Sequence, residues 1–572
     1  MDIIADLQQE LISLIEADCP NDLPESLIAK ITLELPKNKE HGCLSTNAAM
    51  ILAKSFAQKP IILAEKLKSI FNNYIPNIDE INIAGPGFIN FRMKPIFWQD
   101  TLQKIHHNKQ FGQINLGNAQ KVNLEFGSPN PTGPLHVGHS RGAIFGDVLA
   151  NILNFANYDV TRENYINDAG SQIDTLAKSL YLRYEEIATK QAVEIPAGLY
   201  PGEYLIDIAK KIFQTKGNEY LNIPQSESLE IFKKIAIHEM LLLIKSGFKD
   251  LHITHDVHFS EKSLHADNQI NQAIDLLTKQ NKTYYGSLPR PKGKEIEDWE
   301  ETTQLLFKAT EFGDDIDRAL QKNDKSWTYF AADTAYHFNK IKRGYNKMIL
   351  ILGADHGGYI KRMKAMVTAL SDNHATIDIK LCQLVKFIKN NEIMKMSKRD
   401  GSFLTASEVA KAVGSDSLRF IMLTRKNDMT LDFDLDKAVE QSKENPIFYV
   451  QYAHARICSV LRNYEGEATN DFTNLVALNS KLELDLIRHI NIFPQIIRAI
   501  ATNYEPHRLA FYLQELAAKF HSYWNFGKDN PEHKFITANQ STTRARIILL
   551  ETIKNTLNTG LKLFSINALE KM

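Results

Sequence analysis

The sequence predicts an α/β protein in three parts: an α+β domain over residues 1–111, a parallel-sheet domain with helical insertions over residues 112–434, and an all-helical bundle over residues 435–572. Two observations support this prediction. Strand-like and helix-like segments alternate through the middle part, which is typical of a parallel sheet covered by helices. The last part shows helical patterns with few glycines, which favours a bundle.

The first part opens with helical periodicity and ends in a strand-like run at residues 81–93. A mixture of both patterns within one short segment predicts an α+β domain. From the residues alone, this part is interpreted as a simple packing domain.

The middle part begins with an alternating run, Val122, Leu124 and Phe126, which predicts a strand. A loop rich in Pro and Gly follows it. Residues 200–250 are strongly helical, and we expect part of this stretch to be an insertion. An apolar run at residues 381–388 predicts a further strand. The helix expected after the Pro- and Gly-rich loop has these inward positions: Ala143, Ile144, Val148, Leu149, Ile152 and Leu153.

The loop and the start of this helix carry a first signature, SPNPTGPLHVGH, at residues 128–139. A strand–loop–helix unit presents free backbone N–H groups and a positive dipole end, which suit a phosphate. Gly138 allows the backbone to approach a nucleotide closely. His136 and His139 are three residues apart and share a helical face, from which both can donate hydrogen bonds to phosphate oxygens.

A second signature, KMSKR, occupies residues 395–399. Its ammonium groups, Lys395 and Lys398, can close over the β- and γ-phosphates. Alone, a His-x-x-His pair is more often structural and a basic pentapeptide is more often a solvated loop. No Cys or carboxylate stands at metal-ligand spacing beside the histidines, and the Walker P-loop pattern is absent. In this order the two signatures predict an ATP site that transfers a nucleotidyl group and releases pyrophosphate.

The composition is that of a globular protein: 572 residues, 44% hydrophobic and 24% charged, with a net charge of −1. This charge neither indicates nor excludes a polyanionic partner, since nucleic-acid binding needs only local basic patches. Scattered cysteines without a Cys-x-x-Cys motif predict neither disulfides nor structural zinc, and fit a reducing cytoplasm. We expect no membrane span and no signal peptide. The cysteines are Cys19, Cys43, Cys382 and Cys458.

The two signatures resemble the "HIGH" and "KMSKS" signatures of class I aminoacyl-tRNA synthetases. Further segments are similar to arginyl-tRNA synthetases in particular, and together they cover nearly the whole chain. The resemblance implies a Rossmann-type catalytic domain, an N-terminal additional domain that contacts the tRNA elbow, and a C-terminal anticodon-binding bundle. The segments are EHG (40–42), AGPGFINF (84–91), EFGSPN (125–130), NDAG (167–170), AADTAYH (331–337), GADHGGY (353–359) and VQYAHAR (450–456).

The resemblance also implies the chemistry. ATP activates L-arginine to arginyl-adenylate with loss of pyrophosphate, and the 3'-terminal adenosine of tRNA(Arg) then accepts the arginine with loss of AMP. The implied catalytic residues are His136, His139, Lys395 and Lys398. The implied ATP-binding set is Gly133, His136, Gly138, His139, Lys395, Met396, Ser397 and Lys398.

A pocket for arginine must pair a planar cation that has five N–H donors, and carboxylates do so in bidentate geometry. A pocket built around these donors rejects other amino acids by about 10⁴–10⁵, so no editing domain is needed. The implied contacts are Glu125 and Asn130 for the α-amino group, Tyr329 and Asp333 for the guanidinium, and either Asp355 or His356 to complete the pocket.

Aromatic and polar side chains near the start of the last part suit stacking on splayed bases. At helical spacing such residues are more often core, but the resemblance implies that they contact tRNA: Tyr449, Gln451, Tyr452, His454 and Arg456. The expected ligands are ATP with Mg²⁺, L-arginine and tRNA(Arg), and we expect a monomer. Arg399 stands where class I members often carry Ser, with little expected consequence because both lysines are intact.

Two alternatives remain open at this level. One is another nucleotidyltransferase, which makes a small-molecule adenylate. Such an enzyme would not need the long helical C-terminal part. The other is an RNA-binding protein that kept the fold and lost catalysis, in which we would expect damaged signatures. Both signatures are complete.

Overall fold

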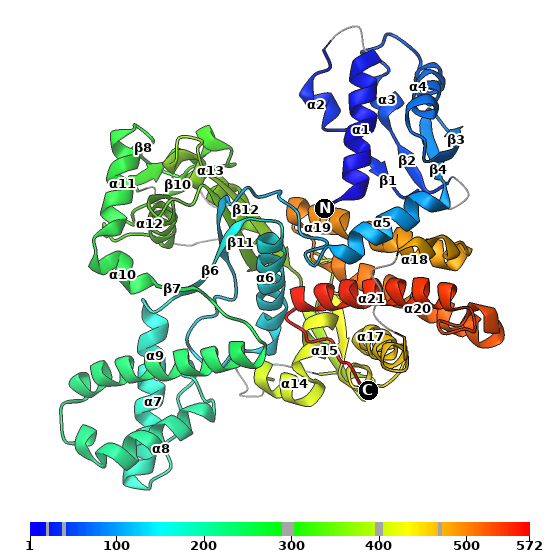
Figure 1. Ribbon diagram of the computed structural model, residues 1–572. Helices are drawn as coiled ribbons and strands as arrows, with labels where there is room; N and C mark the ends of the chain where they lie inside the picture. Colours follow the sequence, from blue (N-terminus) through cyan, green and yellow to red (C-terminus); the bar gives the residue numbers. More distant parts are fainter. Residues whose placement is uncertain (19–21, 37–41, 289–301, 395–403, 467–471) are drawn as a thin grey trace. The chain divides into compact units, whose positions relative to one another are not determined.

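The computed structural model describes residues 1–18, 22–36, 42–288, 302–394, 404–466 and 472–572. The chain forms two compact units (Figure 1). The sheet unit comprises Gly117–Ile447 and Tyr504–His507. The composite unit comprises Met1–Leu116, Phe448–Asn503 and Arg508–Met572. Residues from both ends of the sequence therefore build one unit, and residues 435–447 group with the sheet.

A five-stranded parallel sheet forms the centre of the sheet unit, in the order β12-β11-β5-β6-β7. β5 is central: Glu125 lies opposite Leu350 of β11 on one side and opposite Glu163 of β6 on the other. The strand was expected to alternate, but its last four residues are all buried, because a central parallel strand is covered on both faces. The strands are β5 (Lys121–Glu125), β6 (Asp159–Ile166), β7 (Val257–Ser260), β11 (Lys347–Gly353) and β12 (Thr376–Cys382).

Helices cover this sheet. All six positions expected to face inward on α6 are fully buried, which confirms the helical pattern. A separate core, which includes Ala335, Leu350 and Met366, joins α11, α12 and α13 to β11 and β12. The helices are α6 (Val137–Phe155), α10 (Glu261–Ala266), α11 (Gln269–Lys279), α12 (Tyr329–Lys342) and α13 (Ile360–Leu370).

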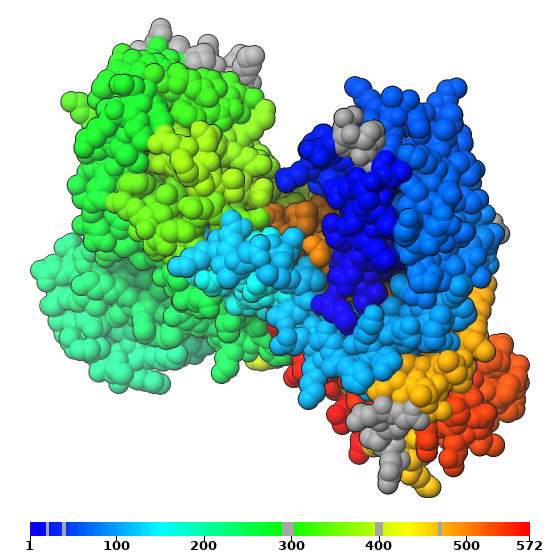
Figure 2. Space-filling view, turned by 45° about the horizontal axis from the view of Figure 1, so that its top comes forward, coloured from blue at the N-terminus to red at the C-terminus, as the bar shows by residue number. Residues whose placement is uncertain are grey.

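A helical insertion separates β6 from β7. It consists of α7 (Ser171–Thr189), α8 (Tyr204–Lys216), the short 3₁₀ helix η2 (Glu219–Leu221) and α9 (Gln225–Asp250). The insertion has its own core around Tyr184, Phe232 and Met240. Figure 2 shows it as a lobe of the sheet unit. The helices predicted within residues 200–250 are confirmed, although the insertion begins earlier, at α7.

Two small sheets complete the sheet unit: β10-β9-β8, which is antiparallel, and β14-β13-β15, in which β13 and β15 are parallel. The single strand predicted at residues 381–388 is wrong: the chain leaves β12 at Cys382 and enters β13 in another sheet. Asn427 imposes this break, because its side chain donates to Leu381 O and its backbone carbonyl accepts from Gln383 N. The elements are β8 (Thr283–Gly286), β9 (Gln304–Phe307), η3 (Ala309–Phe312), β10 (Arg318–Ala319), η4 (Ala354–Tyr359), β13 (Val385–Lys389), β14 (Glu392–Ile393), α14 (Ala406–Val413), α15 (Ser415–Ile421), β15 (Leu431–Asp434) and α16 (Leu435–Ala438).

The N-terminal part of the composite unit is an antiparallel sheet, β1-β2-β4-β3, with helices against it, as an α+β domain requires. The strand-like run at residues 81–93 is a hairpin of β3 and β4. Its turn contains Gly85 and Gly87 at positive φ (55° and 131°), a conformation that favours glycine. The elements are α1 (Ile3–Asp18), α2 (Glu25–Ile28), β1 (Leu33–Glu34), β2 (Leu44–Thr46), α3 (Ala48–Leu52), α4 (Pro60–Tyr74), β3 (Ile78–Ala84), β4 (Phe88–Met93) and α5 (Pro95–His107).

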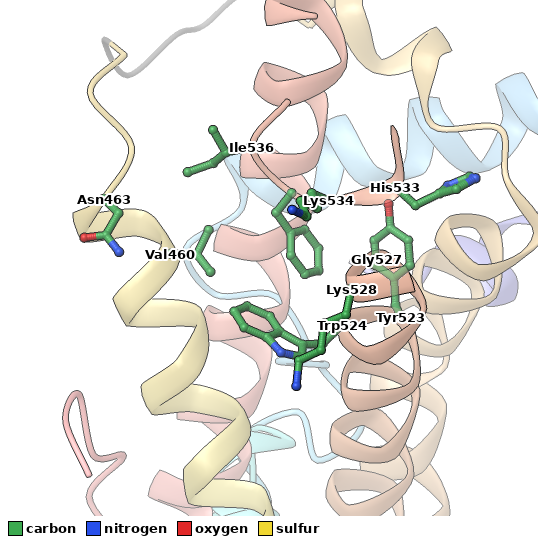
Figure 3. A pocket seen from close by; sticks show the side chains of 10 residues that line it. Val460, Asn463, Tyr523, Trp524, Gly527, Lys528, His533, Lys534 and Ile536 are labelled. Atoms are coloured by element: carbon green, nitrogen blue, oxygen red, sulfur yellow. The ribbon is translucent and has the colours of Figure 1, made fainter. Parts of the chain in front are cut away.

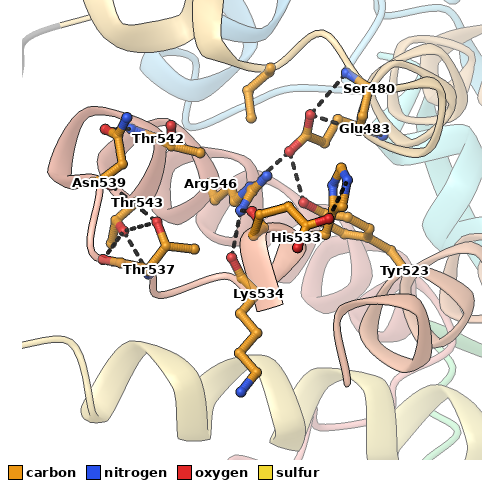
Figure 4. A network of polar contacts seen from close by, with 12 residues as sticks. Ser480, Glu483, Tyr523, His533, Lys534, Thr537, Asn539, Thr542, Thr543 and Arg546 are labelled. Atoms are coloured by element: carbon orange, nitrogen blue, oxygen red, sulfur yellow. Dashed lines mark hydrogen bonds and ion pairs between the residues drawn. The ribbon is translucent and has the colours of Figure 1, made fainter. Parts of the chain in front are cut away.

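The C-terminal part of this unit is helical, as predicted. A buried carboxylate, Glu483, ties its helices together (Figure 4). Glu483 accepts hydrogen bonds from Arg546 Nε at 2.8 Å and Tyr523 Oη at 2.7 Å, and forms a capping box with Ser480. The elements are α17 (Pro446–Arg462), η5 (Thr473–Ala477), α18 (Lys481–Asn491), α19 (Phe493–Asn503), α20 (His507–Asp529), η6 (Pro531–His533) and α21 (Gln540–Leu563).

Candidate active site

The candidate site lies at the carboxyl edge of the parallel sheet. From β5 the chain passes through α6 to β6 on one side, whereas β11 lies on the other side. In such sheets ligands bind where the connections diverge, outside the carboxyl ends of the strands. Glu125 ends β5, and the first signature begins three residues later, at Ser128.

His136 and His139 lie side by side at the start of α6. His136 is the N-cap residue, and its Nδ1 accepts a hydrogen bond from Gly138 N at 2.9 Å. The proton of a neutral His136 is therefore on Nε2, as donation to a phosphate oxygen requires. The ring centroids of His136 and His139 are 5.9 Å apart. A Cβ at Gly138 would lie 2.8 Å from His136 Nδ1, so the cap leaves little room for a side chain there.

The chain that follows the second signature is joined to the first. Val137 N donates to Leu404 O at 3.0 Å, and Ala406 N donates to Leu135 O at 2.8 Å. His136 and Thr405 form an antiparallel bridge between these bonds. The predicted Lys395, Met396, Ser397 and Lys398 lie outside the described residues. Backbone pairing thus places the flank of the second signature beside the histidines.

Three carboxylates face one another at the same sheet edge: Asp333 on α12, Glu125 and Glu261. Burial, together with the negative charges of Glu125 and Glu261, raises the pKa of Asp333 to about 7, although Arg362 acts in the opposite direction. Burial also raises the pKa of Glu261, against the effect of a hydrogen bond with Tyr165. Because ionising all three carboxyls together is unfavourable, a cationic ligand with several N–H donors suits the cluster.

A buried lysine holds Glu125 in place. Lys340 Nζ lies 2.5 Å from Glu125 Oε2, and the Lys340 side chain is 1% exposed. Lys340 also lies 4.3 Å from the ring centroid of Tyr336, whose hydroxyl donates to Glu163 Oε1 at 2.7 Å. Burial alone would raise the pKa of Glu163, but Lys340 and a bidentate Arg343 hold it below its usual value. These ion pairs and hydrogen bonds hold Glu125 and Glu163 in place at the carboxyl edge of the sheet.

The other residues expected around arginine are more exposed to solvent than Glu125 and Asp333. Tyr329 is on the same helix as Asp333, as predicted, but is 75% exposed. Asn130 is exposed. Asp355 and His356 lie on η4 after β11 and pair with each other, with Oδ2 and Nε2 3.6 Å apart. Their mutual contact leaves the choice between them open.

Sequence reasoning missed Glu261, Tyr165 and Lys340. Glu261 directly follows β7, so the rule that strand ends meet at one edge of the sheet could have found it. Lys340 is seven residues after Asp333 on α12 and therefore on the same helical face. Nothing in the sequence indicated Tyr165 of β6 except that the NDAG segment begins two residues after it.

On α17 the predicted tRNA contacts separate into two groups. Gln451 and His454 are buried (3% and 4% exposed) and bind the C-terminal segment: Gln451 Oε1 accepts from Leu569 N at 2.7 Å, and His454 Nδ1 lies 2.8 Å from Leu569 O. These two side chains are therefore engaged within the protein, which corrects the expectation that they face tRNA. Tyr449 packs against His521, with ring centroids 4.5 Å apart.

Tyr452 is exposed and Arg456 is half-buried on the same helix. The Arg456 guanidinium stacks on Tyr452 at 4.2 Å and on Trp524 of α20 at 4.8 Å. Beyond Trp524 lies a cavity of about 240 Å³ that is lined by the C-terminal end of α17, by α20 and by residues 533–536. In Figure 3, Val460 and Trp524 point into this space, with Lys534 close by. Aromatic rings beside cations favour contact with nucleic-acid bases and backbone.

Over the described parts of the chain, no group of three or more His, Cys, Asp or Glu side chains is placed to hold a metal ion. Within the same ranges, no helix is long and apolar enough to span a membrane. Cys43, Cys382 and Cys458 are free and buried.

Three families match the sequence: "Arginyl tRNA synthetase N terminal domain" at residues 1–93, "tRNA synthetases class I (R), catalytic domain" at residues 101–463, and "DALR anticodon binding domain" at residues 450–572. An "Arginine--tRNA ligase" of Azorhizobium caulinodans is 47% identical over 100% of this chain and 99% of its own length, and one of Ehrlichia chaffeensis is 49% identical over 96% of each.

Solved structures agree with the fold. A "putative arginyl t-RNA synthetase" from Campylobacter jejuni is 31% identical, with a TM-score of 0.73 over 84% of this chain and 100% of that one. The Thermus thermophilus arginyl-tRNA synthetase has a TM-score of 0.76 over 100% of both chains at 20% identity, which is a likeness of fold alone.

Proposed function

Because the chain belongs to the arginyl-tRNA synthetase family, we infer that it is an arginine–tRNA ligase. It activates L-arginine with ATP and transfers the arginine to the 3'-terminal adenosine of tRNA(Arg), with release of AMP and pyrophosphate. The observation that carries the substrate assignment is the acidic cluster of Asp333, Glu125 and Glu261, in which burial and the charges of Glu125 and Glu261 raise the pKa of Asp333.

In the first step an oxygen of the arginine carboxylate attacks the α-phosphorus of ATP. The bond from this phosphorus to the bridging oxygen breaks, and pyrophosphate leaves with the electron pair. We propose that His136 and His139 donate to the phosphate oxygens and that Lys395 and Lys398 neutralise the departing pyrophosphate. Catalysis of this kind depends on positioning and charge rather than on a protein nucleophile. The N-cap geometry of His136 supports its part of the proposal.

In the second step a terminal ribose hydroxyl of tRNA attacks the carbonyl carbon of arginyl-adenylate, and AMP leaves. Mg²⁺ enters bound to ATP, as part of the substrate. We propose Gly133, Gly138, Met396 and Ser397 as further contacts of ATP.

For arginine, we propose that the guanidinium lies against Asp333 and Tyr329, and the α-amino group against Glu125 and Asn130. A bidentate contact of the guanidinium with a carboxylate is stronger than a neutral hydrogen bond. The raised pKa of Asp333 supports this placement, because a bound cation relieves the repulsion between the three carboxylates. We add Glu261, which the sequence did not indicate, to the residues of this arginine pocket.

For tRNA, we propose contact through Tyr452, which is exposed, and through the half-buried Arg456 and Tyr449 of the predicted set. The stacking of Arg456 on Tyr452 and Trp524 supports this face. A single chain provides both the signatures and the acidic cluster, so we propose a monomer as the working enzyme. We also propose that it works in the cytoplasm, and the free cysteines support a reducing compartment.

ATP–pyrophosphate exchange with purified protein tests the function. Each standard amino acid is supplied in turn, with and without bulk tRNA. We expect exchange with arginine alone among the amino acids. Exchange with another amino acid would overturn the pocket assignment. No exchange under any condition, with tRNA binding retained, would indicate an RNA-binding protein without catalysis.

A further inference from the structure

The helical insertion contacts the first signature loop, residues 128–136, through the hydroxyl of Tyr204, with Tyr200 close by. Tyr204, the first residue of α8, donates from Oη to the carbonyl oxygen of Thr132 at 2.6 Å. The Tyr200 hydroxyl lies close to the Thr132 side chain. The loop is thus held at the backbone of one residue. Thr132 is four residues before His136.

The surfaces around this contact fit closely. A Cβ on Gly133 would lie 3.2 Å from Tyr204 Oη, and a Cβ on Gly247 of α9 would lie 2.9 Å from Leu135 Cβ. The second distance is shorter than a side chain tolerates, and the first is tight. The insertion therefore supports the loop from Thr132 to Leu135 with little freedom for either surface to shift.

The insertion also holds the segment that carries the two tyrosines. Ser179 Oγ on α7 accepts from Tyr200 N at 2.9 Å, and Arg183 Nη2 donates to Pro201 O at 3.2 Å. Tyr204 itself is half-buried, and burial raises the pKa of its hydroxyl. It remains a donor at neutral pH, and a donor is what the Thr132 carbonyl requires.

We propose that Tyr204 is a positioning residue for amino-acid activation: its hydrogen bond to Thr132 fixes the loop that leads into His136 and so sets the geometry of the ATP site. This inference rests on the proposed placement of ATP at the first signature. Tyr204 acts through the loop backbone and need not touch the substrate. The insertion, which has no chemistry of its own in the mechanism above, thereby supports the first step.

Tyr204→Phe tests the proposal, because it removes one hydroxyl and keeps the ring. Tyr184→Phe is the matched control. Tyr184 Oη donates to Gly217 O at 2.6 Å in the core of the same insertion, and no contact joins it to residues 128–136 among those recorded for the described residues. Initial rates of ATP–pyrophosphate exchange give KM and kcat for ATP and KM for arginine. Active-site titration gives the fraction of competent enzyme.

We expect Tyr204→Phe to raise the ATP KM or lower kcat about five-fold, the effect of losing one hydrogen bond. The arginine KM and the competent fraction should be unchanged. Tyr184→Phe should lower thermal stability and leave all three constants at wild-type values. Wild-type constants in Tyr204→Phe, or equal changes in both variants, would overturn the inference. An inactive wild-type protein would overturn the proposed function instead, so the two failures are distinguishable.

Discussion

Replacing Asp333 with Asn tests the central electrostatic argument in two directions at once. The side chain keeps its shape and loses its charge. Folding raises the pKa of Asp333 from 3.8 to about 7. At pH 8 the ionised carboxyl therefore destabilises the folded protein relative to the unfolded chain by at most about 4 kcal/mol. The unliganded Asn variant is therefore expected to unfold at a higher temperature than the wild type.

Arginine binding should change in the opposite sense. Losing a charge-assisted contact to the guanidinium costs about 1.5–3 kcal/mol, so the arginine KM should rise between about 10-fold and 150-fold while the ATP KM stays constant. In the wild type the arginine KM should also rise as pH falls below about 7, because Asp333 becomes protonated. The Asn variant should lose this dependence.

The sign of the stability change follows from the same pKa. A carboxyl group whose pKa is raised by folding destabilises the native state when it is ionised, so the unliganded wild type gains stability as pH falls from about 7 towards 4. Differential scanning calorimetry of both proteins from pH 5 to pH 8 measures this. Asp317→Asn is the control, because hydrogen bonds from Thr310 and Tyr284 lower the pKa of Asp317 despite its burial. That variant should lose stability. An unchanged arginine KM, or a lower melting temperature in Asp333→Asn, would refute the reasoning.

Three further predictions follow from described contacts. Glu483→Gln leaves Arg546 without its buried charged partner and should reduce the free energy of unfolding by about 3–5 kcal/mol in denaturant titrations; an unaltered midpoint would contradict the network. Hydrogen bonds from Arg546, Ser480 and Tyr523 hold the pKa of Glu483 down despite its burial. The stability that ionised Glu483 contributes to the wild type should therefore be lost as pH drops below the usual range of a carboxyl pKa. Lys340→Met leaves Glu125 buried without a cation and should raise the arginine KM at least ten-fold with tRNA affinity unchanged, whereas wild-type exchange kinetics would show that Lys340 has no effect on the pocket. Arg456→Ala should weaken tRNA binding about ten-fold in filter assays while ATP binding persists; equal tRNA affinity would remove this face from the tRNA site.

The sequence predicted the parallel sheet, α6 and the terminal bundle, because periodic apolar positions reflect burial directly. It could not predict which polar side chains meet. Glu261 and Lys340 are far from Glu125 in the sequence, and only the parallel arrangement of the strands brings them together. The break at residues 381–388 depends on Asn427, a residue more than 40 positions away. Gln451 and His454 are likewise buried because the C-terminal segment, at Asn567 and Leu569, packs against them.

The composite unit joins segments that the ribosome makes far apart in time. Gln99 on α5 donates to Leu478 O at 3.0 Å, and Asn491 donates to Thr101 Oγ1 at 2.9 Å, across separations of 379 and 390 residues. Trp98 is fully buried in the finished unit. The N-terminal sheet can form early in synthesis, but α5 has to wait until residues 117–447 of the sheet unit have been made before its partners emerge. During that interval its apolar side is uncovered, and a nascent chain is most open to misassembly where such a surface is exposed.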